Sequence, residues 1–148
     1  MTALHIANPD DLDRLLPMIM ACHAHHGVSQ NEEECRAALE PLLEGVPHGV
    51  AYLIGPRRSP VGFLVVSFGW SVARGGIEGR IDTFWIREAI RGRGMGTEVL
   101  FGLLPALGQH GVRALHVQIG RDNARGQKLF GKAGFVADDA DARMVRVF

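Results

Sequence analysis

Residues 86–96 read Ile-Arg-Glu-Ala-Ile-Arg-Gly-Arg-Gly-Met-Gly. The residues that lead into this stretch, from Arg80 to Ile86, are rich in β-branched and aromatic side chains, which predicts a strand. From Met95 to about Gln109, apolar side chains recur at three- and four-residue steps, which predicts an amphipathic helix. A strand, a loop dense in glycine and a helix in this order predict an anion-binding site.

The glycines of this loop explain why an anion would bind. Gly92, Gly94 and Gly96 allow backbone amides to turn toward one point, and the N-terminus of the next helix adds unpaired N–H groups and partial positive charge. Arg91 and Arg93 add formal charge. The implied ligand is a phosphate or a pyrophosphate. The alternative is a glycine-rich turn that only joins the strand to the helix.

Two other phosphate-binding loops do not fit this stretch. A dinucleotide fingerprint has the spacing G-x-G-x-x-G early in a βαβ unit, whereas this loop reads G-x-G-x-G and no acidic residue ends the next strand. A Walker A loop closes with Lys followed by Ser or Thr, and no such pair follows Gly96. The sequence therefore favours neither a Rossmann site nor a P-loop.

The rest of the chain shows further helix and strand patterns. Upstream we expect a strand at 4–7, a helix from about residue 10, a helix at 32–43 and a hairpin of 50–54 with 61–68. Downstream we expect a strand at 114–119, a helix at 123–133 and short strands at 135–136 and 144–147. Residues 69–79 are expected to form a connection, and Pro105 is expected to kink or shorten its helix near Phe101. This order is mixed α/β, with hairpins early and a crossover late.

Composition is that of a globular protein. The 148 residues match a single domain, residues 1–148, and 47% of them are hydrophobic. Sixteen basic residues balance 16 acidic ones, so the whole chain has no net attraction for nucleic acid or an anionic membrane, and neither is an expected partner. Two cysteines, no signal-like start and no apolar run near the roughly 18 residues of a membrane span predict a cytoplasmic protein.

Two motifs together make the chain resemble a known family. Residues 86–96 resemble the central motif of the GNAT family of N-acetyltransferases, in which Arg or Gln, two residues, Gly, one residue, and Gly or Ala hold the coenzyme A pyrophosphate. Residues 122–135 read Asp-Asn-Ala-Arg-Gly-Gln-Lys-Leu-Phe-Gly-Lys-Ala-Gly-Phe. This second stretch resembles the family's other motif, an Asn, a helix, a Leu-aromatic pair and Gly-Phe.

The resemblance implies a fold and an activity. The fold is α+β of the GNAT type, with a mostly antiparallel mixed sheet of six to seven strands, a splayed centre and about four flanking helices. The activity is an acyltransferase that moves the acetyl group of acetyl-CoA, as acyl donor, to a primary amine, with no metal. We expect a small-molecule acceptor, because the chain has no additional substrate domain and no acidic stripe. A protein or peptide N-terminus is the alternative acceptor, a non-catalytic coenzyme A sensor or structural module is the alternative function, and family habit implies a homodimer.

The resemblance also assigns the donor site. Backbone groups of Phe84 and Ile86 would pair with the pantetheine arm as an added strand does. The pyrophosphate would be held by the amides of Arg91, Gly92, Arg93, Gly94, Met95, Gly96 and Thr97. Asn123 would contact the pantetheine or brace the splayed strands, and it also suits the N-cap of its own helix.

Amine acetylation requires a base, because only the neutral amine attacks the thioester. Family members often carry an acidic residue at the position of Asp82, and Glu78 is the second candidate. The alternative for Asp82 is a strand-end residue that pairs with Arg80 or faces solvent. The family commonly has a tyrosine where this chain has Phe130, as the acid that protonates the departing thiolate. Phenylalanine cannot do this, which favours the sensor alternative, although a thiol with an ordinary pKa of about 8.5 can leave as thiolate.

Cysteine and histidine residues cluster early in the sequence, at Cys22, His23, His25, His26, Cys35 and His48. Their spacing fits no compact zinc pattern, so we expect no metal site. The His-rich stretch 22–31 is expected to be a polar surface loop, with the lining of the acceptor pocket as the alternative. Trp70 is expected in the core, and Trp85 either there or in an aromatic wall for the acceptor.

Overall fold

The computed structural model describes residues 2–148. Contacts within the chain divide it into two units, one ending at Gln118 and the other spanning Ile119–Phe148. The first unit contains a five-stranded mixed sheet with helices, and the second contains one helix. No helix among residues 2–148 is long and apolar enough to cross a membrane.

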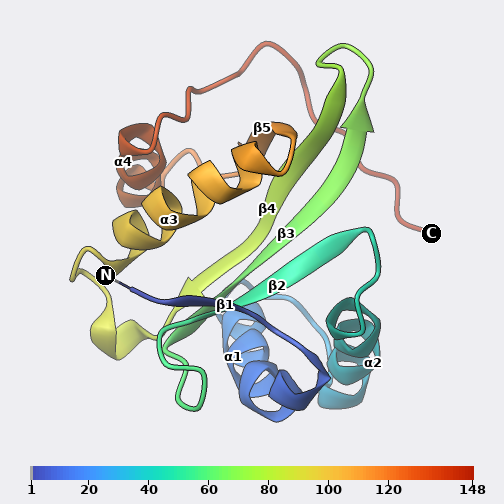
Figure 1. The fold of residues 1–148 in the computed structure, drawn as a ribbon, viewed down its shortest axis with the longest axis vertical. Coiled ribbons are helices and arrows are strands. Elements are labelled where there is room, and N and C mark those ends of the chain that lie inside the picture. Colours follow the sequence, from blue (N-terminus) through green and yellow to red (C-terminus); the bar gives the residue numbers. More distant parts are fainter. Residues whose placement is uncertain (1) are drawn as a thin grey trace. The chain divides into compact units, whose positions relative to one another are not determined.

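The strands of the sheet follow chain order, β1-β2-β3-β4-β5 (Figure 1). They are β1 Leu4–Ile6, β2 Gly49–Ile54, β3 Gly62–Ser71, β4 Gly76–Ile86 and β5 Val112–Val117. The first four pair antiparallel, and β5 pairs with β4 in parallel, which requires a crossover connection. The hairpin of β2 and β3 is confirmed. β3 and β4 are longer than expected, so only residues 72–75 form the connection that was expected over 69–79.

One face of the sheet packs against two helices, α1 Leu12–His25 and α2 Glu32–Leu43. The apolar stripe of each helix meets inward-facing residues of β2 and β3 in one core, which includes Leu15, Met18, Leu39, Leu53 and Phe63. We call this side of the sheet the α1–α2 face. α1 continues through His25, so His23 and His25 are helical and do not belong to a loop as the sequence suggests.

A buried carboxylate fixes the start of α1. Asp11 ends the short 3-10 helix η1, Pro9–Asp11, and has no exposed surface. It accepts hydrogen bonds from Arg14 at 2.7 Å, from Arg57 at 2.9 Å and from the backbone N–H of Asn8 at 2.9 Å. Burial alone raises the pKa of Asp11, but these bonds outweigh burial and lower that pKa below its ordinary value. Since Arg57 belongs to the β2–β3 turn, the network ties this turn to α1.

The opposite face of the sheet packs against α3, Met95–Gln109 (Figure 1). Its buried stripe consists of Val99, Leu100, Leu103 and Leu107. Pro105 does not end the helix near Phe101, because one lost hydrogen bond is outweighed by the buried leucines on both sides of the proline.

An apolar cavity of about 620 Å³ lies on the α3 face, and Trp70 is among its lining residues. Trp70 is 72% exposed and is not in the core, so the sequence expectation for this residue was wrong. β3 pairs with β2 only as far as Ser67 but continues to Ser71. Trp70 therefore lies in the part of β3 that extends beyond β2.

The second unit contains α4, Ala124–Lys132. Phe130 of this helix packs edge-on against Phe135, with ring centroids 5.2 Å apart. The expected strands at 135–136 and 144–147 do not form, so the sheet has five strands and the prediction of six to seven was too high. Both runs are short, and the residues between them include three aspartates, which disfavour strands.

Candidate functional site

β5, the edge strand of the sheet, pairs with only part of β4. Their parallel pairing covers Ile77 to Ile81 of β4, whereas β4 stays paired with β3 as far as Ile86. Residues 82–86 therefore extend beyond the pairing with β5, so the opening between strands lies beside the edge strand and not at the centre of the sheet as expected. An extended ligand can add to such a strand by main-chain hydrogen bonds. Phe84 and Ile86 both lie in this segment.

A β-bulge marks the place where the strands part. Val66 pairs with Ile81 and Val65 pairs with Thr83, so Asp82 is an extra residue in β4. Thr83 lies on the α1–α2 face, because its partner Val65 packs against the core there. The hydroxyl of Thr83 donates a hydrogen bond to Asp82 Oδ2 at 3.3 Å, so the exposed carboxylate of Asp82 lies on the same side.

The loop after β4 has the backbone of an anion cradle. Gly92 and Gly94 have φ angles of 81° and 76°, in the left-handed region that side chains disfavour. Gly94 is also the N-cap of α3 and has no side chain to cap the helix, so the first-turn N–H groups, from Met95 to Thr97, receive no side-chain cap. A Cβ atom at Gly94 would meet nothing within 4 Å, so the space beside this helix N-terminus is open.

Charge at the start of α3 also suits an anion. Arg93 is exposed within the loop. The acidic residue of the first turn, Glu98, accepts hydrogen bonds from the backbone N–H and the hydroxyl of Thr2, and these bonds hold its pKa below the usual range. Its carboxylate is thereby directed to the N-terminal segment. Open backbone amides, a helix dipole and Arg93 together fit a pyrophosphate.

Arg91 makes a different contact from the one its charge suggested. Its guanidinium carbon lies 4.2 Å from the centroid of the Trp85 ring, a cation–π contact, and its Nε donates a hydrogen bond to the carbonyl of Ile86 at 2.7 Å. The side chain thus anchors the loop to the end of β4. The backbone N–H of Arg91 donates a hydrogen bond to the carbonyl of Glu88 at 3.3 Å, and the positive charge of Arg91 lies over Trp85.

Two histidines at the C-terminal end of α1, His25 and His26, also lie next to Trp85. The ring centroids of His25 and His26 lie 5.4 Å and 6.3 Å from that of Trp85. Trp85 packs against the α1–α2 core as well, and its role as an aromatic wall for the acceptor stays a prediction. The His-rich segment therefore lies beside the strand that leaves β5, on the α1–α2 face.

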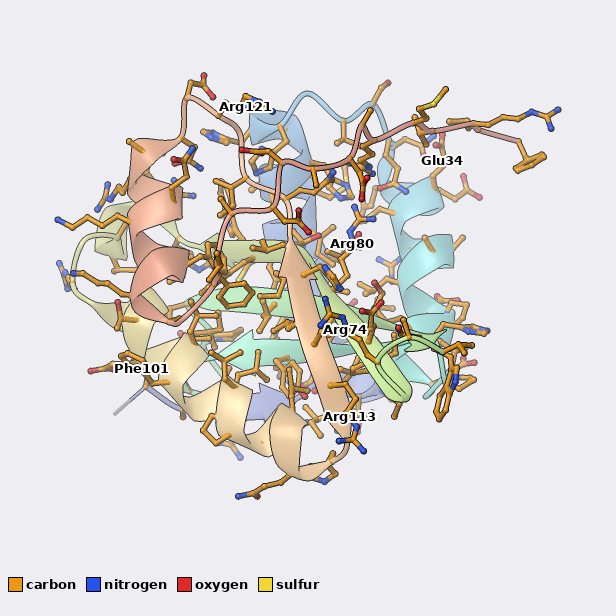
Figure 2. All side chains as sticks on the ribbon, turned by 90° about the horizontal axis from the view of Figure 1, so that it is seen from above. Glu34, Arg74, Arg80, Phe101, Arg113 and Arg121 are labelled. Carbon is orange, nitrogen blue, oxygen red and sulfur yellow. The ribbon has the colours of Figure 1, made fainter. Side chains whose placement is uncertain are left out.

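A polar row continues along β4 on this face. The alternation of the strand directs Glu78 and Arg80 away from the α3 face, because Gly79 between them approaches Val66 and Phe68 there. Arg80 donates a hydrogen bond to Gln118 at 3.3 Å, and Figure 2 shows Arg74 and Arg80 between β5 and α2.

Glu78, the second sequence candidate for the base, is fully engaged by its neighbours. Its Oε1 lies 2.7 Å from Nε of Arg74 and 3.2 Å from Nε2 of His116 on β5. The hydrogen bond and the charge of His116, followed by those of Arg74, outweigh the effect of burial and lower the pKa of Glu78. A carboxylate that stays ionised is a weak proton acceptor. His116 has no role in any sequence motif and is brought to Glu78 only by the parallel pairing of their strands.

Asn123 lies in the second unit and forms the N-cap of α4. Its side-chain oxygen accepts a hydrogen bond from the N–H of Gly126 at 2.9 Å. The capping role that the sequence offered for Asn123 is therefore confirmed, and its role toward the pantetheine stays a prediction.

The cysteines and histidines singled out by the sequence do not converge. Within residues 2–148, no three His, Cys, Asp or Glu side chains have a metal-binding arrangement. Cys22 and Cys35 are buried free thiols, and burial raises the pKa of both, that of Cys22 to about 11 although nearby Arg91 opposes the rise. Such thiols are poor metal ligands because the thiolate is the ligand form.

Comparison with known proteins places this geometry in context. A family model described as the acetyltransferase (GNAT) family matches residues 14–135. No curated protein sequence matches the chain.

Solved structures share the fold at low sequence identity. An integron cassette protein from the mobile metagenome of Cole Harbour Salt Marsh has a TM-score of 0.83 and 24% identity, over 97% of this chain and 89% of the other. An aminoglycoside acetyltransferase from an uncultured soil metagenome, in complex with sisomicin, has a TM-score of 0.79 and 12% identity, over 99% and 96%. A predicted acetyltransferase from Clostridium acetobutylicum with acetyl-CoA has a TM-score of 0.76 and 16% identity, over 98% and 96%.

Proposed function

The chain belongs to the acetyltransferase (GNAT) family, and from this premise we propose that it moves the acetyl group of acetyl-CoA to a primary amine of a small molecule. Membership of this family makes the chain an N-acetyltransferase. What we propose is the identity of its acyl donor and of its acceptor. The N-terminus of α3 carries the donor assignment. It has no side-chain cap and is open at Gly94, and it follows the segment of β4 that extends beyond the pairing with β5.

The donor site is built from backbone groups. Amides from Gly92 to Thr97 would hold the pyrophosphate, the exposed Arg93 would add positive charge beside them, and Arg91 anchors the loop. Residues 82–86 of β4 would pair with the pantetheine arm, which directs the thioester toward the bulge at Asp82. The structural neighbour that contains acetyl-CoA supports this assignment.

The acceptor would bind on the α1–α2 face beside the bulge. Asp82 presents an exposed carboxylate there, which suits an ammonium group, and Trp85 with His25 and His26 offers flat surfaces for the body of a small amine. The soil aminoglycoside acetyltransferase, whose structure contains sisomicin, supports a small polyamine-like acceptor.

The leaving group needs no side-chain acid in this proposal. Phe130 cannot donate a proton, and a thiol with an ordinary pKa near 8.5 is a tolerable thiolate leaving group at neutral pH.

Two measurements test the proposed function. Calorimetric titration with acetyl-CoA should show binding, and panels of aminoglycosides, polyamines and arylalkylamines should release free thiol from acetyl-CoA. Binding without thiol release from any amine would instead favour a coenzyme A sensor. No binding at millimolar acetyl-CoA would remove the donor assignment.

A further inference from the structure

His116 lies at the apex of the opening between the two diverging strands. In the parallel register it is opposite Arg80, and the next residue, Val117, is the last residue of β5 that pairs with β4. One strand residue advances by about 3.3 Å, so the backbone of His116 lies within one step of the point where the strands part. This is the point toward which a thioester carried along β4 would be directed.

The imidazole of His116 lies on the α1–α2 face, the same face as Asp82. It contacts Glu78, which strand alternation places there, and its side chain is 53% exposed. Exposure leaves room for an acceptor molecule against the ring. The charged groups that face His116 are Glu78, Arg74 and Arg80.

Glu78 determines which nitrogen of His116 carries the proton. The carboxylate is ionised and can only accept hydrogen bonds, so Nε2 of His116, at 3.2 Å, is the donor. In the neutral ring, Nδ1 then carries the lone pair. Arg74, at 2.7 Å, fixes the same carboxylate oxygen and keeps Glu78 in place.

We propose that His116 is the general base of the acetyl transfer, acting through Nδ1, and that Glu78 is a positioning residue held by Arg74. The inference rests on the proposed function. One proton of the acceptor's ammonium group passes to His116 and then to solvent. The nitrogen forms a bond to the thioester carbonyl carbon, the carbon–sulfur bond breaks, and the second nitrogen proton neutralises the thiolate, so an amide with one N–H and a free thiol result.

Basicity distinguishes His116 from Asp82 for this step. A general base is most effective when its pKa lies near the working pH, and ordinary imidazoles titrate near about 6.5 whereas ordinary aspartates titrate near about 3.9. Asp82 is exposed and accepts one long hydrogen bond, from the hydroxyl of Thr83 at 3.3 Å. Asp82 therefore binds the ammonium and His116 takes the proton.

The test compares pH–rate profiles of kcat/KM for the wild type and three variants, with thiol release from acetyl-CoA as the assay. The kcat/KM of the wild type should fall as the pH is lowered through neutrality, and we call this part of its pH–rate profile the acid limb. His116→Gln should lower kcat at least about a hundredfold and abolish that limb, because general-base catalysis contributes about 10²–10⁴-fold. Glu78→Gln should lower kcat by about tenfold and retain the limb. His110→Gln, a matched change in the last turn of α3, should behave as the wild type.

Two further readouts separate catalysis from a merely structural role. Calorimetry should give the same Kd for acetyl-CoA in all four proteins. Nitrogen NMR of the protein alone should show His116 protonated at Nε2 and a mixture of tautomers in Glu78→Gln.

Three results would overturn the inference. If His116→Gln keeps the rate and the acid limb, His116 is not the base and the acetyltransferase function stands. If NMR shows His116 protonated at Nδ1, the proposed geometry is wrong whatever the rates. If the wild type releases no thiol with any amine, the proposed function and this inference both fail.

Discussion

Gly94→Asp should weaken donor binding while leaving the protein folded. Gly94 has a φ of 76° and open space where a Cβ would be, so a side chain fits without a clash. A non-glycine residue in this conformation costs about 1–2 kcal/mol. An aspartate at the N-cap of α3 recovers about 1 kcal/mol by capping the helix and favouring its dipole. The free energy of unfolding should therefore change by less than about 1 kcal/mol.

Binding should respond much more strongly than stability. The new carboxylate would lie beside the pyrophosphate, and two like charges about 4 Å apart repel by about 1 kcal/mol in water and about 4 kcal/mol near a protein surface. This corresponds to a loss of about fivefold to a thousandfold in affinity for acetyl-CoA. Calorimetry measures the Kd, and a thermal melt of each variant checks the fold.

Gly94→Asn is the matched control for this prediction. Asparagine has the same shape, tolerates the left-handed region and caps helices equally well, but it carries no charge. It should bind acetyl-CoA about five times to a thousand times more tightly than the aspartate variant. If both variants bind as the parent does, the loop does not hold the pyrophosphate. If both lose binding equally, shape and not charge is responsible, and the electrostatic argument is refuted.

Three further changes probe other parts of the molecule. Asp82→Asn should raise the KM of the acceptor about tenfold and leave the Kd of acetyl-CoA unchanged, and an unchanged KM would remove Asp82 from the acceptor site. Arg91→Lys keeps the charge but loses the stack on Trp85, so donor affinity should fall about threefold to tenfold; equal affinity would show that the stack does not anchor the loop. Asp11→Ala should cost about 2 kcal/mol, measured by urea unfolding. Because the folded pKa of Asp11 is lowered, its contribution is present above pH ~4 and lost as pH falls further, so a wild type whose advantage over Asp11→Ala does not shrink as the pH falls below ~4 would contradict this assignment.

Local signals in the sequence predicted the donor side of the molecule well. The strand before the loop, the left-handed glycines and the apolar stripe of α3 are encoded within a few residues of one another, and the structure contains all three. The hairpin of β2 and β3 was predictable for the same reason, because its turn residues and its β-branched strands are contiguous.

The acceptor side was less predictable because it depends on contacts between distant residues. Glu78 and His116 meet only through the parallel register of their strands, and no spacing rule indicates this pairing. The orientation of Asp82 depends on a bulge, and bulges have no strong sequence signature. The charge of Arg91 suggested a phosphate contact, but the nearby indole ring of Trp85 and the carbonyl of Ile86 hold it instead.

The parallel pairing of β4 with β5 also has a consequence for folding kinetics. β2, β3 and β4 are joined by short connections into antiparallel ladders, whereas β5 can dock only after the chain has passed through the loop and all of α3. Pairing of distant segments is slow because loop closure must precede any stabilising contact. We therefore expect the amide protons of β5 to gain protection from hydrogen exchange after those of β2 to β4, so a refolding chain would complete these three strands before Glu78 and His116 meet.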